Sequence, residues 1–280
     1  MNSLILVAVL SAAFFHAFWN FLVKKNEDKA LAVIAVCLGH LPFSVAALFF
    51  SGLPPLSSLS YLLISAVLHT GYQVFLIHAY RFGELSAVYP IARGLSPLLL
   101  MIAGFILGQD MLSPYQIMAV CLIGLSLLIF GFSQYQLSKK GLKGVLLAVA
   151  TGFFIASYSL VDGLGTREAQ SAIAFYGVLS LLNSLFLTGY FLIWHRASLW
   201  ALPTKGQQIF WIGGGASYLA YVIVLWACLY APIAVVSSLR ETSTLIAVLL
   251  GVFLLKEKMT FGKASAVLLI VMGVMLIRLG

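Results

Sequence analysis

Long apolar stretches alternate with short polar connectors along the whole chain. A helix needs about 20 mainly apolar residues to cross the hydrocarbon core of a bilayer. Ten stretches approach or reach this length, and polar or proline-containing connectors separate them. The pattern therefore predicts an all-α integral membrane bundle of ten transmembrane helices. The predicted helices cover residues 3–23, 30–50, 59–80, 86–108, 114–132, 143–162, 171–193, 207–229, 233–255 and 263–279.

The two halves of the chain repeat each other. At an offset of 147 residues, Arg93 aligns with Arg240 and Ser96 aligns with Ser243, each inside an otherwise apolar stretch. Five predicted helices per half is an odd number, so the second half has to enter the membrane in the opposite direction. The sequence thus predicts an inverted repeat of two five-helix halves. The predicted repeats are residues 1–136 and 137–280.

Composition agrees with a membrane protein and argues against nucleic-acid binding. The chain is 62% hydrophobic and 9% charged, with a mean hydropathy of +1.07, whereas soluble domains contain about 25% charged residues. The net charge is +8, but the basic residues are spread over connectors and form no block beside exposed aromatic residues. We expect a multi-pass protein of the cell membrane, in a bacterial inner membrane. Its partners are the lipid bilayer and a small-molecule substrate, and the sequence leaves a homodimer open.

The connector charges predict an orientation. The connectors after the odd-numbered predicted helices hold twelve basic residues, whereas the opposite side holds only Arg167 and Arg278. Because basic connectors stay on the cytoplasmic side, we expect both chain ends to face outward. The twelve residues are Lys24, Lys25, Lys29, Arg81, Lys139, Lys140, Lys143, Arg196, Lys205, Lys256, Lys258 and Lys263.

Motifs for enzymatic chemistry are absent from the sequence. Cys37, Cys121 and Cys228 fall within apolar stretches without the spacing of metal ligands. The chain contains no HExxH, GxSxG or GxGxxG motif and no phosphate-binding P-loop. We therefore expect no enzyme activity, no bound metal or cofactor and no ATP hydrolysis by this chain.

Two arginines inside apolar stretches are the main candidates for function. An arginine at the centre of a membrane helix costs roughly 2.5–3.5 kcal/mol on insertion scales, and such residues usually face a bundle interior or a watery cavity. Arg93 shares a helical face with Tyr89 and Ser96. It is only a few residues into its predicted helix, so reaching back to the membrane interface is the alternative.

Other deep polar residues accompany the arginines. Glu241 is the deepest acid and is a candidate for proton coupling; the alternative is a structural ion pair, for instance with Arg93. Several tyrosines either line a cavity or join helices by hydrogen bonds. We expect predicted helices 1, 3, 4, 6, 8 and 9 to line a cavity, with 5 and 10 at the periphery. The candidate substrate-binding residues are His16, Trp19, Asn20, Tyr72, Gln73, Tyr89, Arg93, Tyr158, Tyr218, Tyr221 and Arg240.

The chain ends on a pattern that resembles a known family. Glu257 and Thr260 precede a last apolar helix that carries Gly273, which resembles the closing signature of the EamA domain. Residues 108–113 repeat this pattern in the first half, and residues 16–20 resemble the first helix of such domains. The chain thus resembles an EamA-domain transporter of the drug/metabolite transporter superfamily. The resemblance implies ten membrane helices, a cavity between the two halves and alternating access.

Two functions fit these observations. The first is a secondary transporter, a permease or exporter, for a small polar metabolite. Because guanidinium groups bind carboxylate, phosphate and phosphonate oxygens bidentately, the two arginines favour an anionic or zwitterionic substrate such as an amino acid or an organophosphonate. The alternative is a flippase for a lipid or a lipid-linked precursor, whose cavity would open sideways to the bilayer. An intramembrane enzyme would need an acid–base pair or a nucleophile with its base, and the spacing of His69 and Asp162 does not by itself indicate such a pair.

Overall fold

The chain forms an all-α bundle. The computed structural model describes residues 2–82, 85–138, 142–256 and 259–280, and regular structure within these ranges is helical throughout. Lys139, Lys140, Glu257 and Lys258, which entered the connector charges and the family signature, lie outside the described residues. The α-helices are α1 (Ser3–Lys25), α2 (Lys29–Gly39), α3 (Leu41–Ser51), α4 (Leu59–Phe82), α5 (Leu85–Leu107), α6 (Pro114–Ser138), α7 (Leu142–Ala169), α8 (Ala172–Trp194), α9 (Arg196–Lys205), α10 (Gly214–Cys228), α11 (Ile233–Arg240), α12 (Thr242–Leu255) and α13 (Phe261–Leu279).

Polar residues begin several of these helices. The side chains of Asn2, Asp28, Ser171 and Thr260 each accept a hydrogen bond from a backbone N–H group in the first turn of the helix that follows. Such caps satisfy backbone donors that have no partner within the helix. Short polar side chains after apolar stretches therefore set where α1, α2, α8 and α13 begin.

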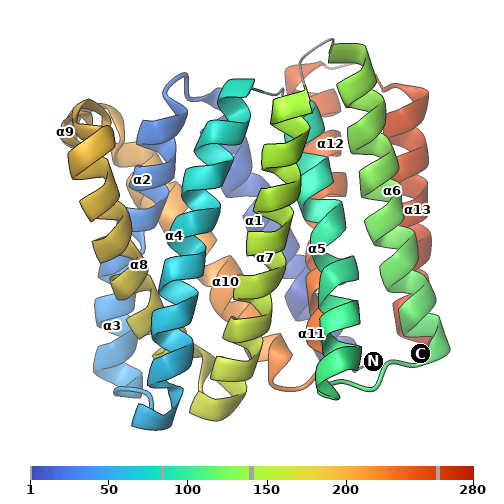
Figure 1. The fold of residues 1–280 in the computed structure, drawn as a ribbon, viewed down its shortest axis with the longest axis horizontal. Coiled ribbons are helices and arrows are strands. Elements are labelled where there is room, and N and C mark those ends of the chain that lie inside the picture. The colour runs from blue at the N-terminus through green and yellow to red at the C-terminus, as the bar shows by residue number, and fades with distance from the viewer. Residues whose placement is uncertain (1, 83–84, 139–141, 257–258) are drawn as a thin grey trace.

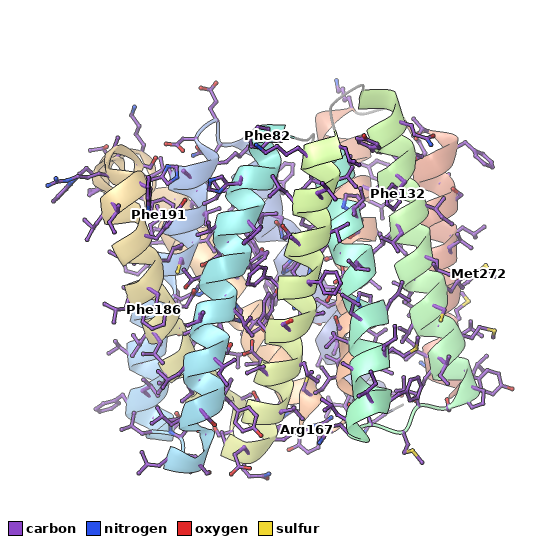
Figure 2. The ribbon with its side chains drawn as sticks, in the orientation of Figure 1. Phe82, Phe132, Arg167, Phe186, Phe191 and Met272 are labelled. Carbon is purple, nitrogen blue, oxygen red and sulfur yellow. The ribbon has the colours of Figure 1, made fainter. Side chains whose placement is uncertain are left out.

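Nine segments of the described residues are long and apolar enough to cross a membrane. They overlap nine of the ten predicted helices, and one of them combines α2 with α3 across a break at His40. Large apolar side chains cover the outside of the bundle (Figure 2), and Phe132 and Met272 are 43% and 46% exposed. Because soluble proteins rarely expose such wide apolar surfaces, this is a multi-pass membrane protein. The nine segments are Ser3–Val23, Lys29–Ser51, Leu56–Ala79, Ala87–Leu107, Pro114–Gln136, Leu142–Ala169, Ala172–Trp194, Ile209–Cys228 and Phe261–Leu279.

The predicted single helix over residues 233–255 is wrong, because the structure divides it at Glu241 into α11 and α12. The backbone N–H of Glu241 donates to the carbonyl of Ser238 at 3.1 Å, which is a tighter turn than an α-helix makes. The Thr242 hydroxyl then donates to the carbonyl of Leu239 at 2.7 Å. Such side-chain bonds compete with helix bonds for the same carbonyls. A helix broken at membrane depth is tolerated where it is buried in protein or lines a cavity.

The helices stand side by side, and both chain ends lie at the same end of the bundle (Figure 1). The short helix α9 lies at the opposite end, in a segment that the sequence pattern assigned to a connector. α6 packs against α5 and α13, and α6 and α13 stand at one edge of the molecule (Figure 1). α1 packs against α10 and α12, whereas α4 packs against α7.

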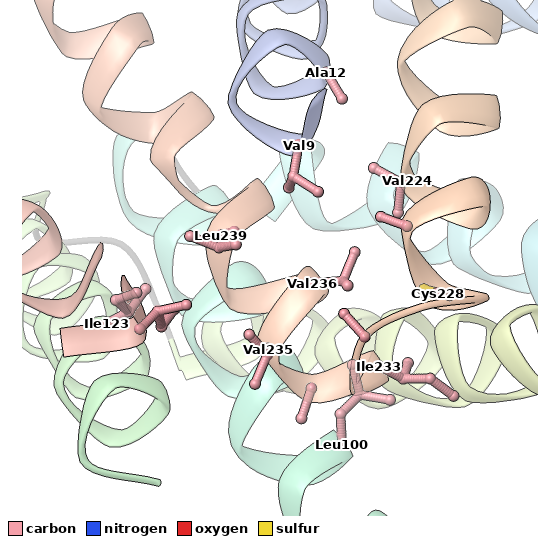
Figure 3. Packing of buried hydrophobic residues seen from close by; sticks show 14 of the residues in the cluster. Val9, Ala12, Leu100, Ile123, Val224, Cys228, Ile233, Val235, Val236 and Leu239 are labelled. Atoms are coloured by element: carbon pink, nitrogen blue, oxygen red, sulfur yellow. The ribbon is translucent and has the colours of Figure 1, made fainter. Parts of the chain in front are cut away.

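A buried apolar cluster surrounds α11. Val235, Val236 and Leu239 of α11 are fully buried and belong to one cluster with Val9 of α1 and Leu100 of α5 (Figure 3). Protein interiors of this kind are packed as densely as organic crystals. This cluster therefore forms a solid apolar layer beneath the end of α11 that carries Arg240.

Candidate functional site

A cavity lies among helices from both halves of the chain. It contains about 1030 Å³ of empty space, including the part that is open to solvent. Side chains from α1, α2, α4, α5, α7, α8, α10 and α11 line it, and no lining residue comes from α6 or α13. α6 and α13 correspond to predicted helices 5 and 10, which we expected at the periphery. The contributions of α2 and α8 were not predicted.

The fold brings ten of the eleven candidate substrate-binding residues to this cavity. The exception is Tyr218, whose ring instead packs against the rings of His40 and Phe43, each at a centroid distance of 5.9 Å. Ser217 and Tyr221 of α10 lie four residues apart on one helix face and line the cavity, and the rotation of α10 leaves Tyr218 to one side of that face. The ten residues at the cavity are His16, Trp19, Asn20, Tyr72, Gln73, Tyr89, Arg93, Tyr158, Tyr221 and Arg240.

Arg93 is held by a network of polar side chains. Its Nη1 donates to Glu241 Oε1 at 3.2 Å, and its Nη2 donates to the Tyr89 hydroxyl at 3.1 Å and to His16 Nε2. Arg93 is 4% exposed and Glu241 is fully buried. Arg93 therefore does not reach to the membrane interface but forms a buried ion pair with Glu241. Whether Glu241 also carries a proton during function stays a prediction.

Arg240 has fewer hydrogen-bond partners than Arg93. Its Nε lies 3.8 Å from Glu241 Oε1, and its Nε and Nη2 have no hydrogen-bond partner within the described residues. Arg240 is the last residue of α11, where the helix dipole favours a cation. Two guanidinium groups thus share one carboxylate. The cluster of Arg93, Arg240 and Glu241 has one surplus positive charge and free N–H donors at the cavity wall.

A second polar cluster centres on Asp162 of α7, which is fully buried. Its Oδ2 lies 2.8 Å from His69 Nε2 and accepts a hydrogen bond from the Tyr221 hydroxyl, while its Oδ1 accepts one from Ser65. The His69 ring stacks on Tyr158 at a centroid distance of 4.0 Å and an interplanar angle of 28°. His69 and Tyr221 line the cavity, whereas Asp162 lies behind them.

Sequence reasoning missed the pairing of His69 with Asp162 and the polar residues of α2 and α8. His40, Asn183 and Tyr176 line the cavity. The amide of Asn183 donates to Cys37 Sγ at 3.4 Å, which joins α8 to α2. The signal for these residues was present, since each is a polar group or a tyrosine inside an apolar stretch. Such residues usually serve only to join membrane helices, so the sequence alone does not single them out.

At the end of the bundle where both chain ends lie, contacts of Arg167 and Asp110 join helix ends and connectors. Arg167, labelled at this end in Figure 2, donates from Nε to the carbonyl of Cys228 at 2.8 Å and from Nη2 to that of Ala231 at 3.0 Å. Its Nη2 also donates to Asp110 Oδ1 at 3.0 Å, and Asp110 Oδ2 accepts from the backbone N–H of Ile233 at 2.9 Å. We call this set of contacts the Arg167 latch. The cavity lies away from it, because the lining residues of α1 and α5 come from the ends of these helices opposite to the chain ends.

Comparison with protein families matches residues 142–279 to the EamA-like transporter family. This second half of the chain belongs to the EamA-like transporter family. The match covers α7 to α13, which is the half that carries Arg240, Glu241 and Asp162.

Two further proteins are similar to this chain. A WAT1-related protein of Arabidopsis thaliana is 25% identical over 141 residues, which are 49% of this chain and 37% of the plant protein. One crystal structure superposes with a TM-score of 0.73 at 15% identity, covering 100% of this chain and 99% of the other. At this identity the second likeness concerns the fold alone.

Proposed function

We propose that this protein is a secondary transporter that moves a small anionic or zwitterionic metabolite, such as an amino acid or an organophosphonate, by alternating access. One observation carries the proposal: Arg240 lines the cavity, and its Nε and Nη2 have no partner among the described residues, in a cluster with one surplus positive charge. A carboxylate or phosphonate group supplies both the missing negative charge and the missing acceptors.

The two arginines then have different roles. Arg93 already donates to Glu241, Tyr89 and His16, so it serves mainly to position Glu241 and the wall of the site. Arg240 binds the anionic group. Tyr72, Gln73 and Asn20 surround the same space with neutral hydrogen-bonding groups, which suits the polar remainder of a small metabolite.

The proposed architecture has ten crossings in two inverted halves, 1–136 and 137–280. Both chain ends lie at one end of the bundle, which requires an even number of crossings. Nine candidate spans and the broken pair of α11 and α12 satisfy this requirement. With the basic connectors in the cytoplasm, the cavity lies toward the cytoplasmic side and the Arg167 latch closes the outer side.

Transport by purified protein in proteoliposomes tests the proposal, with radiolabelled L-alanine and methylphosphonate as probes. We expect saturable uptake of at least one probe. Arg240→Gln should lower kcat/KM by about 30-fold or more, because losing one partner of a buried charged contact costs about 2 kcal/mol or more. Arg240→Lys should fold normally but raise KM, since lysine makes no bidentate contact.

The matched control is Arg278→Gln, which removes an exposed arginine of α13 away from the cavity. It should transport like the wild type. Normal uptake by Arg240→Gln would end the assignment of Arg240. Scrambling of a fluorescent phospholipid by the wild type, without uptake of either probe, would favour the flippase instead.

A further inference from the structure

The buried carboxylate of Asp162 needs a partner for its negative charge, and it takes no part in the proposed anion site. Asp162 is fully buried, and a buried carboxylate is costly unless it is paired and hydrogen-bonded. Ser65 and Tyr221 donate neutral hydrogen bonds to it. Within the described part of the chain its ion-pair partner is His69, at 2.8 Å. This partner is a cation only when its ring holds two protons.

Glu241 is in the opposite situation. Arg93 and Arg240 contact it, and both stay charged at any physiological pH. Two permanent cations therefore already balance the charge of Glu241. The pair of His69 and Asp162 instead changes its charge by one unit when His69 gains or loses a proton, and histidine is the side chain that does so near neutral pH.

We propose that His69 and Asp162 form a proton-binding site that couples proton movement to anion transport. The inference rests on the proposed function. The charges around the cavity explain the coupling. The cluster of Arg93, Arg240 and Glu241 has one surplus positive charge, and with His69 neutral the negative charge of Asp162 offsets it across the cavity. A proton on His69 removes this offset, and the anionic group of a substrate on Arg240 then restores it. Proton and anion therefore bind together more favourably than either does alone, and the protein moves them in the same direction.

The cavity gives the proton a route to His69, and Tyr158 connects His69 to the proposed anion site at Arg240. His69 and Tyr221 face the cavity, so the proton reaches the pair from the same space as the substrate. Tyr158 stacks on His69 and also lies within electrostatic reach of Arg240. Further titratable or charged groups near the pair come from neighbouring elements: His40 between α2 and α3, Tyr176 of α8, Cys228 of α10 and Arg240 of α11. His40, Tyr176 and Cys228 carry no permanent positive charge that could replace the charge of protonated His69.

The first experiment measures L-alanine binding to purified protein between pH 6 and pH 8, a range in which this probe does not change its own charge. For the wild type we expect Kd to rise with pH, by at most about tenfold per unit for one linked proton. For His69→Gln, which keeps an N–H donor for Asp162 but cannot be charged, Kd should change by less than about twofold over this range. The control His78→Gln, on the same helix and outside the cavity wall, should keep the pH dependence of the wild type.

The second experiment follows proton entry with a pH-sensitive dye inside proteoliposomes while L-alanine, which releases no proton of its own in this pH range, enters. The wild type and His78→Gln should acidify the interior with the probe, whereas His69→Gln and Asp162→Asn should not. Proton entry with the probe in His69→Gln at the wild-type ratio would overturn the proposal. Probe entry without protons in the wild type would also overturn it.

A third measurement does not depend on any substrate. NMR spectra of protein with labelled histidine are recorded from pH 5 to pH 8, and the His69 signal is identified by its loss in His69→Gln. We expect the His69 ring to change protonation within this range and Asp162→Asn to move that change. If the wild type takes up neither probe but His69 behaves in this way, the proposed substrate class fails and the proton site stands. A His69 ring that keeps one protonation state throughout would refute the proton site itself.

Discussion

At the scale of single residues, the decisive fact is that one buried carboxylate holds two guanidinium groups. Glu241 Oε1 lies 3.2 Å from Arg93 Nη1 and 3.8 Å from Arg240 Nε. If Arg93 is lost, Glu241 still has Arg240, and the cluster is neutral. If Glu241 is lost, two buried cations face each other without a counter-charge. The carboxylate is therefore more important for stability than either arginine alone.

Glu241→Gln should accordingly destabilise the fold by about 3–5 kcal/mol, as removing one partner of a buried ion pair does. Adding Arg93→Gln to it should recover much of this loss, because only one cation then remains. Thermal unfolding in detergent measures both variants. Glu168→Gln, which changes an exposed glutamate of α7, is the matched control and should leave Tm nearly unchanged. A double variant no more stable than Glu241→Gln would contradict the charge argument.

At the scale of helices and connectors, the Arg167 latch joins the ends of α7, α10 and α11 to the connector between α5 and α6. Arg167 donates to two carbonyls and one carboxylate, and Asp110 in turn accepts from the start of α11. One ion pair thereby satisfies a carbonyl at the end of α10, a connector carbonyl and the first N–H group of α11. Opening this end of the bundle requires the latch to break.

Arg167→Gln should therefore shift the protein toward a state that is open at this end. Cys228, which is buried beside the latch, reports the shift, because its reaction with N-ethylmaleimide should become about tenfold faster if the variant loses about 1.4 kcal/mol of latch energy. Cys37, buried near the other end of the cavity, serves as the internal control. Equal rates for Cys228 in the variant and the wild type would argue against a latch.

At the scale of the whole molecule, the proposed orientation in the membrane rests on connector charges and the position of the chain ends. The basic connectors gather at the end that holds α9, and both chain ends lie at the opposite end. In the proposed orientation the cavity faces the cytoplasm. An outer side closed by the Arg167 latch and an open inner side are one of the two states that alternating access requires.

Labelling of intact cells with a membrane-impermeant maleimide checks this orientation. Ser3→Cys, exposed at the start of α1, should be labelled in intact cells, whereas Ala197→Cys, exposed on α9, should be labelled only after permeabilisation. The parent protein provides the background of its own cysteines. The reverse result for the two positions would invert the assignment and place the cavity mouth outside.

The sequence by itself determined the features that depend on local pattern. Hydropathy over about 20 residues defines a membrane helix whatever its neighbours are, so nine predicted helices overlap candidate spans. Helical periodicity and the cost of charge in lipid directed attention to Arg93 and Arg240, and both line the cavity. The closing pattern around Thr260 and Gly273 indicated the family that residues 142–279 match.

Only the tertiary structure decided which polar groups meet. His69 and Asp162 are 93 residues apart, and the packing of α4 against α7 joins them. The same holds for Arg93 with Glu241, for the break between α11 and α12, and for the rotation of α10 that turns Tyr218 away from the cavity and Tyr221 toward it. The physical reason is that a helix's length and its polar face are properties of its own residues, whereas its rotation and its neighbours are set by how all the helices pack together.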